Sequence, residues 1–569
     1  MEKSDEKPAW RAWVRWGDLL IAMVLFWVGT TVWTTGGGGE LPWWAGPHDA
    51  LLEGPDAGEW ASNALAFADG RYLDLDPHRM PTYLIFTGFT TKLVGSVALA
   101  GHLVNHLTHA LLGVVLYLLG ASLHSRAAGV LAALVAVTSP LLVAASWRFG
   151  VDPTVAFVVP LSVLCGVLGG RHWRLSPVAG AAAILVTAAH FSTLFHGLPV
   201  LLAVLLFGRG WKGRLLSIAG FAVGAWAVNW WIFSRFPFVG LDGLMSAIPE
   251  GVVPGSQSTS GHSGVNMAPA IATIRAGLGD GLEGALTGVL TVLHTSIVPW
   301  GVSVAAFWLG VLGPGLKRVN REGVELPLHR RFDLKGGLVL LACLAPLPLL
   351  SAAGAPPRYG YNLLPVAILL YARGLVSMAA IAQHLIEKLS GRFASGLSGR
   401  LSFLGGVAVV GWVVAIVVGG NFWREAAPRH EQRPPNISAT AAMVIGEQMR
   451  ELSPEYGGAV SPLREALIYA NKRYCPTTVC PDTDHLAAYW DCLEIADREC
   501  SGDGPIPWVG LWRATHDERS PARVAMDAWV AEEFGVESTV EVPMGNPEFK
   551  ANISLIPRER LRDRAPQRY

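Results

Sequence analysis

The sequence predicts an α-helical polytopic membrane protein with about eleven transmembrane helices and a small C-terminal α/β domain. Of the 569 residues, 51% are hydrophobic and only 15% are charged, whereas soluble proteins carry about 25% charged residues. The apolar residues gather in runs of about 15–25, the length that crosses a bilayer. Many of the 22 Trp residues stand near the ends of these runs, as interfacial anchors do.

The apolar runs give the predicted spans in chain order. They lie near residues 18–34, 98–120, 127–146, 153–170, 177–191, 195–208, 215–233, 286–312, 336–353, 361–383 and 401–420. The pair at 177–191 and 195–208 is short, so a tilted or re-entrant pair is the alternative. No small-residue cleavage site follows the first run, which predicts an uncleaved span rather than a signal peptide.

Lysine and arginine predict the orientation. They occur in alternate connections, namely in the N-terminal segment, near Arg126 and Arg171, and within 209–214, 317–335 and 388–400. Short loops rich in positive charge stay cytoplasmic. We therefore expect the protein in the cytoplasmic (inner) membrane with a cytoplasmic N-terminus. The remaining connections, which are 35–97, 147–152, 234–285, 354–360 and the region from 421, are expected outside.

This orientation predicts two domains. We expect residues 1–420 to form a transmembrane domain with a long first outer loop at 35–97, and residues 421–569 to form a periplasmic or extracellular domain. Patterning in the second domain predicts helices at 439–452 and 522–533 and strands at 459–460, 508–511 and 538–542. The net charge of +0 gives no reason to expect a nucleic-acid partner.

Four cysteines cluster in the C-terminal domain: Cys475, Cys480, Cys492 and Cys500. In an oxidising compartment they predict two disulfides, whose connectivity the sequence does not fix. A zinc site is the alternative, although the first two cysteines lack C-x2-C spacing.

The first outer loop contains two predicted helices. Residues 55–70 have Pro55 at a first-turn position, acids in the first turn and Gly70 as terminator, which is typical of a helix. Residues 81–99 are apolar but contain two glycines, and predict an interfacial helix, because another span here would break the charge alternation.

Acids and an arginine gather on the predicted outer face: Asp56, Glu59, Asp152 and Arg358. Such groups fit a reaction in which an acid activates an acceptor hydroxyl and a cation holds a phosphate leaving group. Simpler interpretations exist. The first two acids favour a helix N-terminus, Asp152 can be solvated in its short loop, and Arg358 can extend to lipid headgroups.

Three histidines, His102, His106 and His109, lie at i, i+4 and i+7 of the second predicted span. This spacing places them along one helix stripe. Two such imidazoles can share a divalent metal ion, the one cofactor that the sequence suggests. They can equally hydrogen-bond lipid phosphate or neighbouring helices.

Four segments together resemble the GT-C superfamily of glycosyltransferases, which includes protein O-mannosyltransferases and the lipid A aminoarabinose transferase. These segments are Gly54-Pro55-Asp56-Ala57-Gly58-Glu59-Trp60 running to Gly70, His78-Arg79-Met80-Pro81-Thr82-Tyr83, Ser139-Pro140 followed by Asp152-Pro153, and Arg358-Tyr359 with Pro365. They occur in the family's order over roughly residues 10–420.

The resemblance implies an inverting enzyme that moves a sugar from a polyprenyl-phosphate carrier to a protein, lipid or cell-envelope glycan outside the cytoplasmic membrane. It implies that Asp56 is the catalytic acid-base residue and that Asp152 positions the acceptor or a divalent metal. Arg358, with Tyr359 and Arg79, would contact the donor phosphate. The sequence departs from the family at Ala57, where a second acid is usual, and Glu59 is the candidate substitute.

Two other function classes remain open. A transporter or lipid flippase usually shows internal repeats and charged groups in mid-membrane, whereas this chain shows no clear repeat and its acids lie outside. A non-catalytic envelope assembly protein would use the cysteine-bearing domain as its interaction module. The expected partners are therefore a polyprenyl-phosphate sugar donor, membrane lipids and an envelope acceptor.

Overall fold

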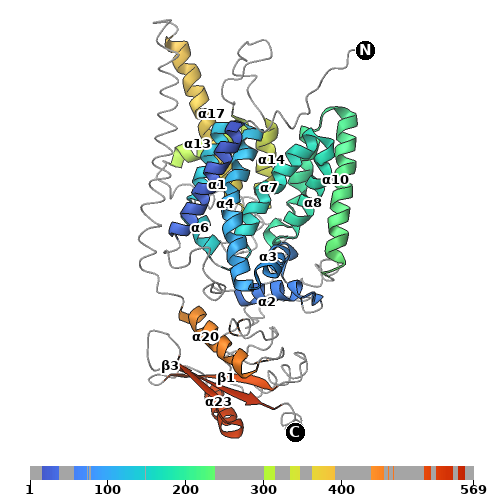
Figure 1. The fold of residues 1–569 in the computed structure, drawn as a ribbon. Coiled ribbons are helices and arrows are strands. Elements are labelled where there is room, and N and C mark those ends of the chain that lie inside the picture. The colour runs from blue at the N-terminus through green and yellow to red at the C-terminus, as the bar shows by residue number, and fades with distance from the viewer. Residues whose placement is uncertain are drawn as a thin grey trace, which may run out of the picture.

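The computed structural model is a bundle of helices with a small sheet beyond one end (Figure 1). It describes residues 16–36, 57–72, 75, 79–147, 149–236, 300–313, 334–346, 362–390, 437–453, 459, 466, 469, 505–513, 521–541 and 549–557.

Most of the described elements are helices. In chain order the helices of the bundle are α1 (Trp16–Gly36), α2 (Ala57–Ala68), α3 (Pro81–Val94), α4 (Val97–Leu123), α5 (Arg126–Val137), α6 (Pro140–Trp147), α7 (Asp152–Arg171), α8 (Ser176–Thr187), α9 (Gly197–Phe207), α10 (Gly210–Phe233), α13 (Trp300–Leu312), α14 (Leu334–Leu344) and α17 (Leu364–Ser390). The C-terminal elements are α20 (Ile437–Leu452), β1 (Ile506–Arg513), α23 (Pro521–Phe534), β2 (Ser538–Glu541) and β3 (Phe549–Ile556).

Five of the described helices are long and apolar enough to cross a membrane. They are α1, α4, α7, α10 and α17, and four shorter apolar helices lie among them. The chain is therefore a multi-pass membrane protein. The run at 401–420 and parts of those at 286–312 and 336–353 lie outside the described residues, so the count of eleven spans stays a prediction.

The predicted span at 127–146 is not one continuous helix. It is divided into α5 and α6, because Pro140 lacks the backbone N–H that would continue the helix and restricts the residue before it. Thr138 ends α5, and its hydroxyl donates to the Leu134 carbonyl at 2.7 Å.

The short pair α8 and α9 does not have the length to cross the bilayer. With 12 and 11 residues, these helices are about 18 and 16 Å long, against about 30 Å of hydrocarbon. The turn between them contains the buried polar residues Ser192, Thr193 and His196. Thr82 of α3 holds the end of α8, because its amide donates to the Ala188 carbonyl at 3.1 Å and its hydroxyl to the Leu185 carbonyl at 2.7 Å. These facts favour the re-entrant alternative.

The two predicted helices of the first outer loop are present as α2 and α3. Helix α2 ends before Gly70, which has a left-handed φ of 75°. Helix α3 ends at Gly95 with φ 76° and so stops before the predicted residue 99. Gly88 lies within α3 without interrupting it. The Phe67 ring and the Ala64 carbonyl occupy the space that a side chain at this position would need. Figure 1 shows α2 lying across one end of the bundle.

The C-terminal strands form an antiparallel sheet in the order β1-β3-β2. Ile445 and Met449 of α20 pack with Val509 and Ile553 of this sheet. On α23, buried Asp527 accepts a 2.8 Å hydrogen bond from the Trp508 indole of β1. Strand β3 is absent from the sequence prediction, and the predicted strand at 459–460 is wrong at Ala459, which lies in neither a helix nor a strand.

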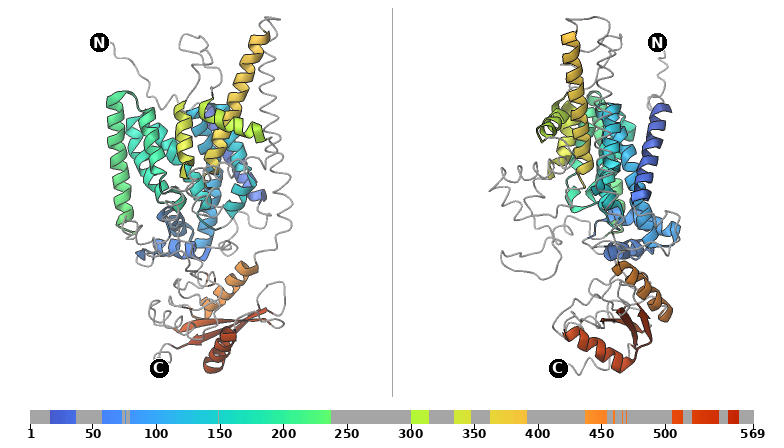
Figure 2. Two further views of the ribbon diagram at one scale, coloured as in Figure 1. Left: turned by 180° about the vertical axis from the view of Figure 1, so that it is seen from behind. Right: turned by 90° about the vertical axis from the view of Figure 1, so that its left-hand side faces the viewer.

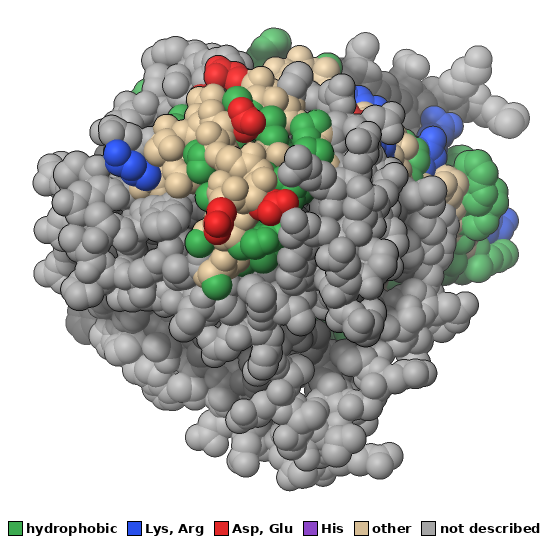
Figure 3. Space-filling view, turned by 90° about the horizontal axis from the view of Figure 1, so that it is seen from below, with side chains coloured by type: hydrophobic (Ala, Val, Ile, Leu, Met, Phe, Trp, Pro, Cys, Tyr) green, Lys and Arg blue, Asp and Glu red, His purple; other side chains and the backbone are tan. Residues whose placement is uncertain are grey.

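The C-terminal elements lie at the same end of the bundle as α2 in both views of Figure 2. Seen from this end, acidic side chains gather among the described residues (Figure 3). Tyr469 packs against both the bundle core and the sheet cluster. This arrangement agrees with the prediction that the first outer loop and the C-terminal region share one side of the membrane.

Glycine-to-alanine substitution in α10 tests how closely the helices pack. A methyl group at Gly224 would overlap the Pro177 carbonyl of α8, whereas the same group at Gly213 meets nothing within 4 Å. We expect Gly224→Ala to lower the free energy of unfolding by about 2 kcal/mol, and Gly213→Ala to be neutral or to raise it by up to about 1 kcal/mol. Thermal unfolding in detergent measures both; equal effects would contradict this packing.

Candidate functional site

Glu59 and Arg79 form an ion pair in the first outer loop. Glu59 lies in the first turn of α2, and Arg79 lies two residues before α3. Their side chains are only 11% and 17% exposed, respectively, and the Arg79 guanidinium lies 5.1 Å from the centre of the Trp60 ring. The pair joins the starts of two helices, and Asp56, which lies outside the described residues, directly precedes α2.

A series of edge-to-face aromatic contacts extends from this pair into the bundle. Trp60 contacts Tyr83 at 5.5 Å, Tyr83 contacts Phe149 at 6.0 Å, and Phe149 contacts His102 at 6.4 Å between ring centres. Burial raises the pKa of the Tyr83 hydroxyl far above its usual range, so this group stays neutral. The contacts fix the first outer loop against the second, which contains Phe149.

Each of the three predicted histidines of the stripe on α4 contacts a different residue. His102 packs on Phe149, His106 stacks on Trp33 at 4.4 Å, and Nε2 of His109 lies 3.1 Å from the Val137 carbonyl. No group of three or more His, Cys, Asp or Glu side chains that could hold a metal occurs in the part of the chain that the structure describes. The predicted metal site on this stripe therefore has no support among these residues.

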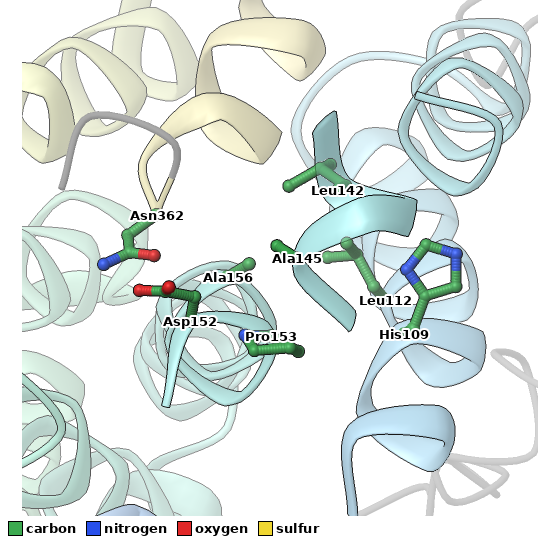
Figure 4. A pocket seen from close by; sticks show the side chains of 8 residues that line it. All are labelled: His109, Leu112, Leu142, Ala145, Asp152, Pro153, Ala156 and Asn362. Carbon is green, nitrogen blue, oxygen red and sulfur yellow. The ribbon is translucent and has the colours of Figure 1, made fainter. Parts of the chain in front are cut away.

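Asp152, the first residue of α7, lines a small cavity between α4, α6, α7 and α17 (Figure 4). The other lining residues are His109, Leu112, Leu142, Ala145, Pro153, Ala156 and Asn362. The cavity volume is about 20 Å³, enough for one water molecule. The structure thus brings two predicted site residues, Asp152 and His109, to one place.

Asn362 is the residue of this cavity that the sequence prediction lacks. It lies two residues before α17 and is 1% exposed. The sequence offered one signal, because an amide at the edge of a long apolar run is costly unless it binds something. Asp152 and Asn362 together supply oxygen atoms of the kind that hard cations prefer, but fewer than such a site needs.

The remaining predicted residues lie outside the described part of the chain. These are Asp56, Arg358, Tyr359 and the cysteines Cys475, Cys480, Cys492 and Cys500. Among described residues, Cys165 and Cys343 are free thiols. The predicted disulfides therefore stay a prediction.

Removal of one partner of the Glu59–Arg79 pair tests how much the pair contributes to the free energy of unfolding. Glu59→Gln removes the negative charge that faces the largely buried Arg79 guanidinium, and we expect a loss of about 3 kcal/mol in the free energy of unfolding. The double substitution Glu59→Gln with Arg79→Met should cost less than the sum of the single changes. Asp69→Asn is the matched control, because Asp69 is 48% exposed beside Arg71, and it should change stability by less than about 0.5 kcal/mol.

Comparison with known proteins identifies the fold. No protein-family model and no curated protein matches the sequence. The crystal structure of ArnT from Cupriavidus metallidurans bound to undecaprenyl phosphate is similar, with a TM-score of 0.54 and 16% identity over 93% of this chain and 97% of that one. The apo form of the same protein gives a TM-score of 0.53 and 14% identity with the same coverage.

A third solved structure is less similar. The apo form of an oligosaccharyltransferase from Archaeoglobus fulgidus has a TM-score of 0.45 and 12% identity over 86% of this chain and 69% of its own. The similarity to ArnT, a lipid A aminoarabinose transferase of the GT-C superfamily, extends over almost the whole of both chains. The chain described here therefore has the GT-C fold.

Proposed function

We propose that the protein is an inverting glycosyltransferase that takes a sugar from a polyprenyl-phosphate carrier at the outer face of the cytoplasmic membrane. The observation that carries this proposal is the convergence of Asp152, His109 and Asn362 on one cavity between α4, α6, α7 and α17 of a GT-C fold. The undecaprenyl phosphate in the ArnT structure supports the donor class. The acceptor is a protein, a lipid or a cell-envelope glycan.

The proposed reaction is a single displacement at the anomeric carbon of the sugar. Asp56 takes the proton of the acceptor hydroxyl as the oxygen attacks. The new bond joins this oxygen to the anomeric carbon, the bond from that carbon to the phosphate oxygen breaks, and the electron pair leaves on the phosphate. Arg358, with Tyr359, stabilises the charge that develops on this leaving group.

The Glu59–Arg79 pair and Asp152 have supporting parts in this proposal. Glu59 and Arg79 fix the start of α2 next to Asp56, because their charges bind each other; Arg79 reaches the donor phosphate only if it leaves Glu59. Asp152 positions the acceptor or a divalent metal ion, whose charge would help to neutralise the phosphate. The membrane lipids contact apolar faces such as that of α10, where Trp226 is 69% exposed.

The C-terminal region from 421 is proposed to be a separate α/β domain outside the membrane that binds the acceptor. Its described sheet and helices, and its place at the α2 end of the bundle, support this assignment. A second contact site would orient a large acceptor before transfer. Unchanged turnover of the natural acceptor after deletion of residues 424–569 would refute this part of the proposal.

Substitution of Asp56 tests the reaction class. In lipid nanodiscs with a panel of polyprenyl-phosphate sugars, we expect Asp56→Asn to reduce sugar release or transfer at least about 100-fold, because the general base is lost. Asp69→Asn, an exposed acid in the same loop, should keep the wild-type rate. The amount of sugar product is measured by mass spectrometry.

The opposite results would favour the other function classes. Carrier uptake into vesicles that survives Asp56→Asn but is lost when Arg373 within α17 is replaced would indicate a transporter. Absence of turnover and of carrier binding in well-folded wild-type protein would indicate an assembly protein, in which deletion of residues 424–569 abolishes function.

Substitution of Arg358 tests donor binding separately from proton transfer. Loss of one charge-assisted contact of about 1.5–3 kcal/mol raises the Kd roughly 10- to 100-fold, and we expect this change in binding of polyprenyl phosphate to Arg358→Gln. Arg235→Gln is the control, because Arg235 follows the outer end of α10 and its guanidinium lies 4.7 Å from the centre of the Trp231 ring. Equal affinity in all three proteins, measured by native mass spectrometry, would contradict the assignment.

A further inference from the structure

Asn362 carries a buried amide without a hydrogen bond to any residue that the structure describes. Its Oδ1 and Nδ2 atoms are both fully buried. In the same segment, the buried hydroxyl of Ser377 is satisfied, since it donates to the Arg373 carbonyl at 3.0 Å. A buried amide without a partner costs free energy comparable to a lost hydrogen bond, so this position is expected to bind a group from outside the chain.

The surroundings of the amide indicate what that group is. Figure 4 shows the Asn362 amide and the Asp152 carboxylate directed toward one another at one side of the cavity. The opposite wall contains Leu112, Leu142 and Ala145, which offer no side-chain hydrogen-bonding atoms. The volume of about 20 Å³ is enough for one hydroxyl-sized oxygen.

We propose that Asn362 and Asp152 together bind one hydroxyl-sized oxygen. In the resting protein the amide N–H donates to this oxygen and an O–H of the bound water donates to the Asp152 carboxylate, so that the Asn362 amide is satisfied. The two ends of an amide are similar in shape, and either can face the cavity. Nε2 of His109 is already directed to the Val137 carbonyl, which leaves Asp152 and Asn362 as the binding pair.

The bound oxygen belongs to water in the resting protein and to the acceptor hydroxyl during transfer, when it still accepts from the Asn362 amide while its single O–H is directed to Asp56, the proposed base. The second identification rests on the proposed function. Asn362, which lies just before α17 and beside Asp152, is then a binding residue for the nucleophile. Its amide orients the oxygen without removing the proton, because an amide is neither an acid nor a base near neutral pH.

Thermal unfolding of the full chain in nanodiscs tests the binding pair without any turnover. If the amide is satisfied by an oxygen shared with Asp152, Asn362→Leu lowers the Tm by a few degrees, and the loss is smaller when Asp152 is already replaced by Asn. The control is Asn63→Leu, because buried Asn63 donates to the Glu59 carbonyl at 2.8 Å; its effect should be the same in both backgrounds. A Tm that rises in Asn362→Leu, or an equal loss of Tm with and without Asp152→Asn, overturns the proposal. If Asn362→Leu does not fold, Asn362→Ala is measured in its place.

A transfer experiment with methanol tests which oxygen is bound. Wild-type protein and Asn362→Leu are given a polyprenyl-phosphate sugar in water with methanol, and the rate of methyl glycoside formation is measured. We expect the variant to lower this rate about tenfold, since one hydrogen bond to the alcohol is lost. An unchanged rate of methyl glycoside formation refutes the nucleophile assignment alone. Absence of sugar release by the wild type refutes the proposed function, and the unfolding series then decides the inference.

Discussion

Close contact between helix backbones is the constraint on which the rest of the structure depends. In lipid the hydrophobic effect does little to hold helices together, so association relies on packing of small residues. At the crossing of α4 and α5, a side chain on Gly120 would meet the Gly129 backbone at 2.5 Å. Because α4 also packs on α1, α3 and α7, its position determines where the outer loops and the Asp152 cavity lie.

The sequence predicted the elements well where a single local signal decides. Long apolar runs became α1, α4, α7, α10 and α17, and Gly70 marked the end of α2. The apolar run at 127–146 predicted one span, but the steric effect of Pro140 divides it into α5 and α6. Strand β3 was missed although Ala551 and Ile553 alternate with polar residues, because its pairing with β1 and β2 brings together distant segments.

Sequence reasoning named two residues that the structure places at one cavity, Asp152 and His109, but not the contacts that the candidate residues make. Asp152, which the family resemblance implied would position the acceptor or a metal, lines a cavity. Glu59 and Arg79 received separate predicted roles, yet they bind each other; this pairing depends on the path of the chain between α2 and α3. The histidine spacing correctly indicated one helix face, but the partners Trp33 and Val137 come from other helices.

The half-length pair α8 and α9 has a consequence for biosynthesis. Its polar turn cannot face hydrocarbon unsatisfied, because each bare backbone group there costs several kcal/mol. Thr82, which bonds the end of α8, precedes the pair in the chain and has left the ribosome when α8 emerges. We therefore expect the pair to enter the membrane only against an already inserted N-terminal part, so that its insertion depends on the segment that contains Thr82.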